Sequence, residues 1–183
     1  MAEHEYLRIE RAAERKSEFV RGEMFLMPGG TPKHSMLAAN AIVDIGAQLR
    51  GKRCRVLTSG MRLRTPAGTH HYPDVSVTCG PIQLFPGSID ILTNPVLIIE
   101  VLSPSTSNYG RTVKFDLYRL IPTLLDYVIL HQNAIQAEHH SKLPDGSWLL
   151  TEYLGPDARI LLPNIECELH LGSIYDGVMD EPV

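Results

Sequence analysis

The sequence contains little cysteine, and its three cysteines show no pattern that would join them. Cys54, Cys79 and Cys167 are odd in number and scattered, without any close cysteine pair. This spacing argues against a disulfide framework and against a cysteine zinc site, because both need paired or clustered thiols. We therefore expect the three cysteines to be small core residues.

The sequence also lacks a long apolar segment, an internal repeat and any low-complexity stretch. Its apolar run at residues 95–102 is too short to cross a bilayer, and the polar, acidic start at residues 1–5 is unlike a signal peptide. A length of 183 residues with 44% hydrophobic residues is typical of one soluble domain. We expect a single domain over residues 1–183, a cytoplasmic location and no membrane partner.

Net positive charge is absent as well, since the formal net charge is -4. That balance argues mildly against a protein that coats nucleic acid through bulk charge. The distribution is uneven, because no acidic residue lies between Asp44 and Asp74, whereas six basic residues do: Arg50, Lys52, Arg53, Arg55, Arg62 and Arg64. On a strand, Arg62 and Arg64 would share one face. We interpret that face either as a solvated surface or as a contact surface for DNA phosphates.

Among the residues that are present, Glu100 is the most informative, because it lies inside the apolar run at residues 95–102. This run predicts a short buried strand. An ionised carboxylate there costs roughly several kcal/mol unless a cation or a set of hydrogen bonds replaces its water. Asp74 opens a second predicted strand directly after Pro73. Two such carboxylates can converge on one point across a sheet.

Residues 111–120 have helical spacing and bring a lysine into the same argument. The apolar stripe of this predicted helix consists of Val113, Leu117 and Leu120. Lys114 lies beside the stripe, with Arg111 before it and Tyr118 one turn after it. Lys114 could therefore face the two acids, either in a metal-dependent site or as the partner of Glu100 in a buried ion pair. The residues alone leave both interpretations open.

The rest of the pattern predicts helices over residues 7–19 and from residue 34 or 35 to 49, with a hairpin turn at Arg21-Gly22 between them. Strands are expected near residues 55–57, 61–64, 73–78, 95–102, 125–131, 134–140, 148–154, 159–162 and 168–171. Helices in the first two thirds and strands clustered later indicate an α/β or α+β domain with a mixed, strongly curved sheet.

Several motifs resemble a known family. They are the segments at residues 18–23, 32–35, 72–75, 100–106 and 121–127, together with Lys114, Phe115 and Tyr118. They are similar to the Uma-type restriction endonucleases abundant in cyanobacteria, a branch of the PD-(D/E)XK nuclease superfamily. The resemblance covers nearly the whole chain, and its most specific part is Glu-Val-Leu-Ser-Pro-Ser-Thr at residues 100–106. It implies a restriction-endonuclease-like fold, with a central mixed, curved sheet flanked by helices.

The resemblance also implies a chemistry, that of a metal-dependent endonuclease acting on DNA. Asp74 and Glu100 match the acids that hold Mg²⁺ (or Mn²⁺), and the backbone carbonyl of Val101 would be a further ligand. The superfamily pattern has its lysine where this chain has Leu102, and Lys114 matches the family's substitute on the helix. We expect a homodimer, because dimers are the commonest closed assembly and suit cleavage of a duplex.

Four further residues match the neighbourhood of such a site: Glu23, His34, Arg111 and Tyr118. The chain departs from the family in one place, because Tyr109-Gly110-Arg111-Thr112 stands where the family has Tyr-Asp-Arg-Gly. This departure keeps open a catalytically inactive nuclease-fold module that binds DNA or another protein. A metal-dependent hydrolase that acts on a different ester is a third hypothesis.

Overall fold

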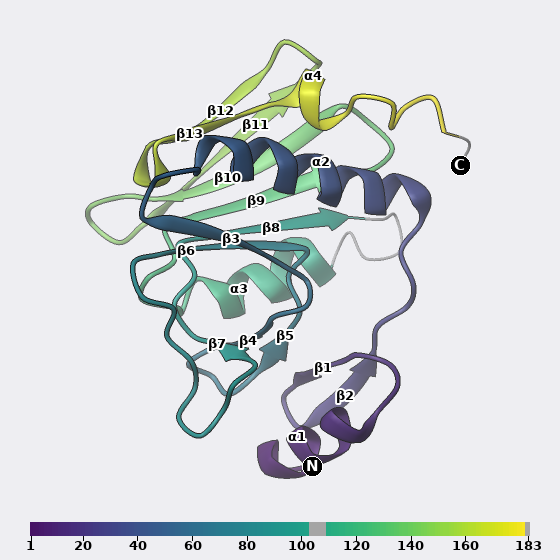
Figure 1. Ribbon diagram of the computed structural model, residues 1–183, viewed down its shortest axis with the longest axis vertical. Helices are drawn as coiled ribbons and strands as arrows, with labels where there is room; N and C mark the ends of the chain where they lie inside the picture. Colours follow the sequence, from purple (N-terminus) through teal and green to yellow (C-terminus); the bar gives the residue numbers. More distant parts are fainter. Residues whose placement is uncertain (103–108, 182–183) are drawn as a thin grey trace.

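The computed structural model describes residues 1–102 and 109–181, apart from the side chains of residues 109–111, and its centre is a six-stranded sheet (Figure 1). In spatial order the strands are β11 (Trp148–Leu154), β10 (Gln136–Lys142), β9 (Asp126–His131), β8 (Leu97–Leu102), β6 (Val75–Cys79) and β3 (Cys54–Thr58). β8 and β9 pair in parallel and the other neighbours pair antiparallel. The predicted mixed sheet is therefore confirmed.

A second sheet of five short strands lies below the central sheet in Figure 1. Its order is β2 (Glu23–Leu26), β1 (Ser17–Val20), β5 (His70–His71), β4 (Arg62–Arg64) and β7 (Ile91–Leu92). The predicted hairpin is confirmed: β1 and β2 are joined at Arg21 and Gly22, which have φ angles of 51° and 84°. Two consecutive positive φ angles are typical of the tight turn that matches the twist of a hairpin.

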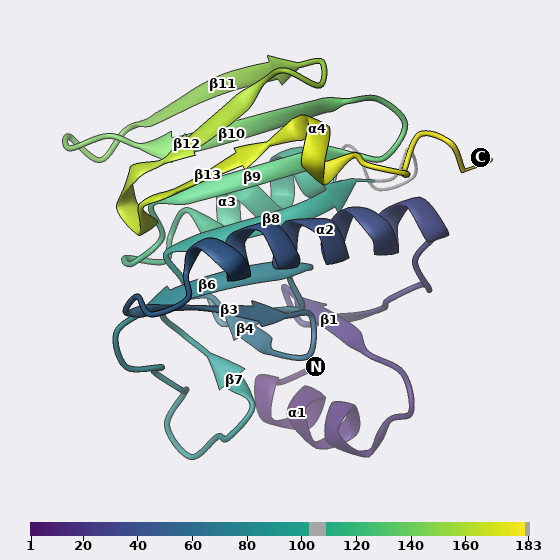
Figure 2. The ribbon, with the colours of Figure 1, turned by 45° about the horizontal axis from the view of Figure 1, so that its top comes forward.

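Helix α2 (Pro32–Gln48) packs on one face of the central sheet, as Figure 2 shows. Its buried residues Leu37, Ala41 and Ile45 recur at helical spacing and belong to the larger hydrophobic core. Thr31 caps the helix, since its hydroxyl accepts a hydrogen bond from the His34 amide, and proline fits the first position. This cap explains why the helix begins at residue 32 and not at the predicted 34 or 35.

The same face also carries the ribbon of β12 (Arg159–Leu162) and β13 (Cys167–His170), a 3-10 turn η2 (Pro163–Ile165) and the short helix α4 (Leu171–Ile174). On the opposite face lie a π-helical segment η1 (Tyr109–Lys114) and helix α3 (Phe115–Tyr118). None of the described helices is long and apolar enough to span a membrane.

The predicted apolar stripe of the η1–α3 segment is partly wrong. Leu117 is buried, but Leu120 is 49% exposed. Besides Leu117, the buried side chains of this segment are those of Lys114, Tyr118 and Ile121. Because the segment is π-helical up to Lys114, the residues do not follow the regular spacing of 3.6 per turn on which the stripe was predicted.

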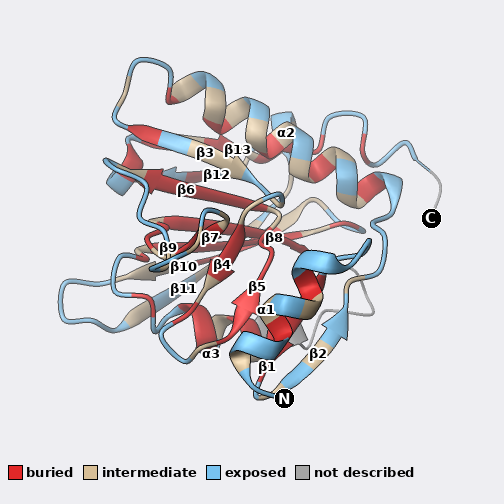
Figure 3. Ribbon diagram, turned by 60° about the horizontal axis from the view of Figure 1, so that its bottom comes forward, coloured by how far each residue is buried: buried red, intermediate tan, exposed pale blue. Residues whose placement is uncertain are grey.

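Helix α1 (Glu3–Ala12) begins and ends earlier than the predicted helix over residues 7–19. Ala13 is extended and the chain enters β1 at Ser17. The buried carboxylate of Glu10 accepts hydrogen bonds from the Ser17 amide and from the Tyr72 hydroxyl, at 2.9 Å each. The red segments of α1 and β1 in Figure 3 mark this buried contact between the N-terminal segment and the second sheet.

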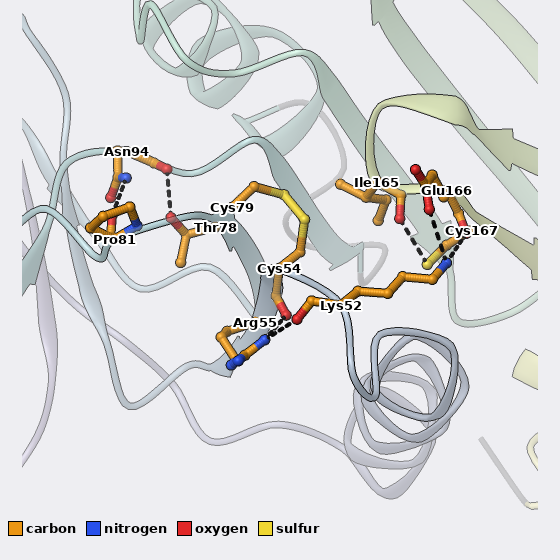
Figure 4. The surroundings of a disulfide bond; sticks show 10 residues. All are labelled: Lys52, Cys54, Arg55, Thr78, Cys79, Pro81, Asn94, Ile165, Glu166 and Cys167. Atoms are coloured by element: carbon orange, nitrogen blue, oxygen red, sulfur yellow. Dashed lines mark hydrogen bonds and ion pairs between the residues drawn. A yellow bond between two sulfur atoms is a disulfide. The ribbon is translucent and has the colours of Figure 1, made fainter.

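Cys54 and Cys79 form a disulfide, so the expectation of three unpaired core thiols is wrong for these two residues (Figure 4). They are directly opposed at the paired ends of β3 and β6, with their Cα atoms 3.9 Å apart. Their separation of 25 residues gave no hint of this register. Cys167 is a free, buried thiol, as expected.

Removing the disulfide should lower stability mainly by freeing the unfolded chain. A closed loop of 25 residues contributes about 3.5 kcal/mol in the chain-entropy description. We expect the double variant Cys54→Ser, Cys79→Ser to lose about that free energy of unfolding in urea titrations, and a reductant to have a similar effect on the wild type. Reductant should leave the double variant unchanged, and a reductant effect of equal size there would contradict this assignment.

Candidate active site

Two acids meet where β6 begins beside β8. Glu100 is the fourth residue of β8, and Asp74 immediately precedes β6. The antiparallel register pairs Val75 with Ile99, so continuing it by one residue sets Asp74 opposite Glu100. One oxygen of Asp74, Oδ2, accepts a hydrogen bond of 2.8 Å from the Val101 amide. Strand register therefore places the two predicted acids side by side.

Glu100 is buried, and its carboxylate is held by two donors from the η1–α3 segment. The Lys114 ammonium lies 3.1 Å from Oε1 and 3.3 Å from Oε2, and the Tyr118 hydroxyl donates to Oε1 at 2.8 Å. Burial is the largest influence on this group and raises the pKa of Glu100 to about 7, against the opposing effect of the Lys114 charge. Glu100 is thus a buried acid whose charge is only partly compensated.

Lys114 lies between two carboxylates. Besides Glu100 it contacts Glu18 of β1, with 2.8 Å between Nζ and Oε1. Burial lowers the pKa of Lys114, but the two carboxylates outweigh that effect and hold the pKa above its ordinary value. Lys114 is therefore a protonated, buried cation at neutral pH, and the ion pair with Glu100 that the sequence left open is present.

Sequence reasoning did not single out Glu18, although the same argument that found Glu100 applies to it. Glu18 lies within β1, all four residues of which are buried. Its Oε1 is also 3.5 Å from Nδ1 of the buried His71 on β5. Burial alone would raise the pKa of Glu18, but Lys114 and His71 lower it to about 2. An acid inside a buried strand was the signal that could have identified it.

Glu23, which was expected near the site, lies elsewhere. It is exposed on β2, opposite Val20 across the hairpin, and makes no contact with Asp74, Glu100 or Lys114 in the described part of the chain. The tight turn reverses the chain between Glu18 and Glu23, so that only Glu18 faces the interior. Glu18 therefore takes the place that was predicted for Glu23.

The other accessory residues have different outcomes. His34, in the first turn of α2, lies with Nε2 3.2 Å from Asp74 Oδ2, and this contact raises the pKa of His34. Tyr118 is fully buried and edge-on to the ring of His71, 5.2 Å between centroids. The side chain of Arg111 falls outside the described residues. Gly110 and Thr112 both lie in η1.

The predicted DNA-contact surface of Arg62 and Arg64 is wrong, because both side chains are engaged within the protein. Arg62 is 4% exposed, and its Nε donates to the Tyr72 hydroxyl at 2.8 Å. Arg64 forms a two-bond pair with Glu3, with distances of 2.6 and 3.1 Å, and stacks over Phe85. The charges of this face are neutralised by Glu3 of α1 and by Asp90, which precedes β7. The spacing of residues in the sequence could not reveal these distant partners.

The donor set at Asp74 and Glu100 fits a hard divalent cation. Mg²⁺ prefers oxygen ligands and is commonly held by one or two carboxylates, with waters and substrate phosphate oxygens completing its shell. No group of three or more His, Cys, Asp or Glu side chains in residues 1–102 and 109–181 is arranged to hold a metal. The two neighbouring carboxylates of Asp74 and Glu100 are the oxygen donors that this chemistry would use.

Comparison with solved structures defines the class of fold. The structure matches the crystal structure of a "putative nuclease belonging to DUF820" from Anabaena variabilis with a TM-score of 0.79, covering 97% of this chain and 99% of that one at 20% identity. The fold is therefore restriction-endonuclease-like, as expected.

The sequence comparisons define the family. The chain belongs to the Uma2 family, described as "Putative restriction endonuclease", whose model matches residues 4–172. Two similar proteins come from Synechocystis, and both are described as uncharacterized. One is 36% identical over 157 residues, covering 85% of this chain and 89% of that protein. The other is 33% identical over 180 residues, covering 97% and 93%.

The low pKa of Glu18 predicts a pH-dependent contribution to stability. A carboxyl with a pKa of about 2 in the folded protein and 4.5 when unfolded stabilises the fold above pH 4.5. That contribution is about 3 kcal/mol and is lost as the pH falls from 4.5 through 2. In urea titrations, Glu18→Gln should be less stable than wild type by about this amount at pH 7, and the difference should shrink below pH 4.

Glu23→Gln provides the matched control, because it changes the same residue type on the same hairpin at an exposed position. It should alter the free energy of unfolding by less than about 0.5 kcal/mol at either pH. Equal effects of the two substitutions would show that the contact between Glu18 and Lys114 does not stabilise the protein.

Proposed function

We propose that this protein is a metal-dependent endonuclease that hydrolyses DNA phosphodiester bonds, with Asp74, Glu100 and Lys114 as its catalytic residues. The main support is a pair of neighbouring contacts. Lys114 contacts the buried carboxylate of Glu100, and the amide of the next residue, Val101, donates a hydrogen bond to Asp74. Burying several charged groups costs stability, and buried clusters of this kind are common where the charges serve catalysis. Membership of a nuclease-like family supports the same conclusion.

In this proposal Asp74, Glu100 and the Val101 carbonyl would hold Mg²⁺ or Mn²⁺. When bound, such an ion polarises a phosphate and lowers the pKa of a coordinated water. Lys114 supplies a fixed positive charge for the phosphoryl oxygens in the transition state. Because its pKa is raised, Lys114 serves as a charge and hydrogen-bond donor and not as a general base.

The surrounding residues position these groups. Tyr118 donates to Glu100 Oε1 and so restricts the rotation of that carboxylate. Glu18 holds the ammonium of Lys114 from the side of the second sheet. Hydrolysis adds one water across the phosphodiester: its oxygen bonds to phosphorus, one ester P–O bond breaks, and the departing oxygen ends as a hydroxyl.

One observation favours the alternative of an inactive nuclease-fold module that binds DNA or another protein. Lys114 and Tyr118 already satisfy both oxygens of Glu100, as they would in a purely structural ion-pair cluster. Gly110, where the family has an acid, lies in the same η1 segment as Lys114. Turnover therefore has to be tested directly.

Nicking of supercoiled plasmid tests the nuclease proposal. We expect cleavage in Mg²⁺ or Mn²⁺ and none in EDTA. Asp74→Asn and Glu100→Gln should each reduce the rate by orders of magnitude, because each removes a charge from the metal site. Glu23→Gln should cleave like wild type. Undiminished nicking by Asp74→Asn, or no nicking by wild type with any divalent metal, would contradict the proposal.

Lys114→Met separates the catalytic role from the structural role. It should lower the free energy of unfolding by about 3–5 kcal/mol, because two buried carboxylates lose their cation. If Lys114 is also catalytic, nicking should stay lost under conditions in which thermal melts show that the variant is folded. A folded Lys114→Met that nicks at the wild-type rate would leave only the structural role.

We also propose a homodimer, for which the exposed edge of the central sheet is a suitable surface. β11 is the outermost strand of that sheet and exposes Leu149, Leu150 and Leu154. Light scattering after gel filtration should give twice the mass expected from a 20.4 kDa chain. Leu150→Lys with Leu154→Lys should shift the mass to that of a monomer, whereas Leu161→Lys on β12 should not. A monomeric wild type would refute the dimer.

A further inference from the structure

An open groove of about 1060 Å³ leads to the candidate site. Its walls come from residues 15–16 between α1 and β1, residues 26–30 at and after the end of β2, residues 34–42 of α2, and residues 58–59 at the end of β3. His34 and Asp74 lie together in its lining, joined by their 3.2 Å contact. The groove therefore gives solvent a path to the acid that opens β6.

The charge of this groove is complementary to a phosphate backbone. Asp74 is the one acidic residue among its lining residues, whereas Arg15 and Lys16 are exposed cations on its wall. Lys16 donates to the Ser59 carbonyl at 2.7 Å, which fixes its ammonium across the groove. Arg15 makes no ion pair with any described residue. Arg62 and Arg64, by contrast, are neutralised inside the protein.

Apolar side chains line the groove next to the two exposed cations. They include Leu26, which is 57% exposed, Ile42 of α2, and Met27, whose amide donates to the Lys16 carbonyl at 2.9 Å. Gly29 has open space where a side chain would be, and a Cβ at Gly30 would lie only 3.0 Å from the His34 ring. A strand of nucleic acid carries charged phosphates and apolar base faces, and this groove offers cations and apolar side chains next to one another.

We propose that the groove holds one strand of DNA, with Arg15 and Lys16 on the phosphates next to the phosphodiester at Asp74. This inference rests on the proposed nuclease function and adds where the substrate lies. It moves the DNA contact from the predicted arginines of β4 to the segment between α1 and β1. Direct phosphate contacts by two cations also predict a salt dependence of defined size.

Fluorescence anisotropy with a labelled DNA duplex in EDTA measures binding separately from metal-dependent cleavage. The variant Arg15→Ala, Lys16→Ala should weaken binding by about ten-fold or more and reduce the slope of log affinity against log salt by about 2. The matched control is Arg50→Ala, Arg53→Ala. It removes the same charge from exposed residues near the other end of α2, outside the groove lining, and should leave both quantities close to wild type.

Ala39→Glu gives an independent test, because Ala39 is an exposed lining residue on α2 and glutamate is a good helix former. It should weaken DNA binding while the melting temperature stays near that of wild type. If the Arg15→Ala, Lys16→Ala protein does not fold, the DNA affinity of Ala39→Glu tests whether DNA occupies the groove.

Three results would overturn the groove proposal: no DNA binding by wild type, equal loss from the groove and control pairs, or no loss from either groove variant. The nicking assay reports on the proposed function separately. If the groove substitutions weaken DNA binding but the wild type does not nick DNA, the groove proposal stands and the nuclease proposal is rejected. If the wild type nicks DNA but substitutions at Arg15, Lys16 and Ala39 leave binding unchanged, the nuclease proposal stands and the groove proposal is rejected.

Discussion

The position of one buried cation, Lys114, governs the arrangement of the rest of the site. An ammonium without water is costly unless carboxylates replace its hydration, and here Glu100 and Glu18 do so from two different sheets. Their contacts join the η1–α3 segment, the central sheet and the N-terminal hairpin at a single point. Because removal of any one partner leaves an uncompensated charge, the second sheet is held to the first by electrostatics as well as by apolar packing.

Sequence reasoning could find the parts of this site whose signal is local. An acid in an apolar run identified Glu100, the Pro73-Asp74 strand start identified Asp74, and helical spacing directed Lys114 towards them. It could not find contacts that depend on how distant segments pack. Arg62 looked like a surface residue until Tyr72 and Asp90 came beside it, and nothing local distinguishes such an arginine from a solvated one.

The same distinction between local and distant signals applies to the fold. Strands with clear turns at both ends, such as β11 and β12, match their predicted ranges, and the hairpin at Arg21-Gly22 is confirmed because its turn chemistry is local. The two-residue strands β5 and β7 carry too little pattern to be recognised and exist only through pairing. The disulfide likewise depends on the register of β3 against β6, which sets Cys54 opposite Cys79.

Stability and the proposed chemistry place opposite demands on Glu100. Lys114 and Tyr118 satisfy its oxygens in this structure, so a divalent ion would have to share or replace those donors. The carboxylates of Glu18, Asp74 and Glu100 all lie near Lys114 or His34: the Lys114 ammonium contacts Glu18 and Glu100, and the His34 ring contacts Asp74. Burial meanwhile raises the pKa of Glu100, which reflects a carboxylate that is short of positive charge. An excess of negative charge lowers the stability of this cluster. The same excess would attract a metal ion and, through the metal, a phosphate.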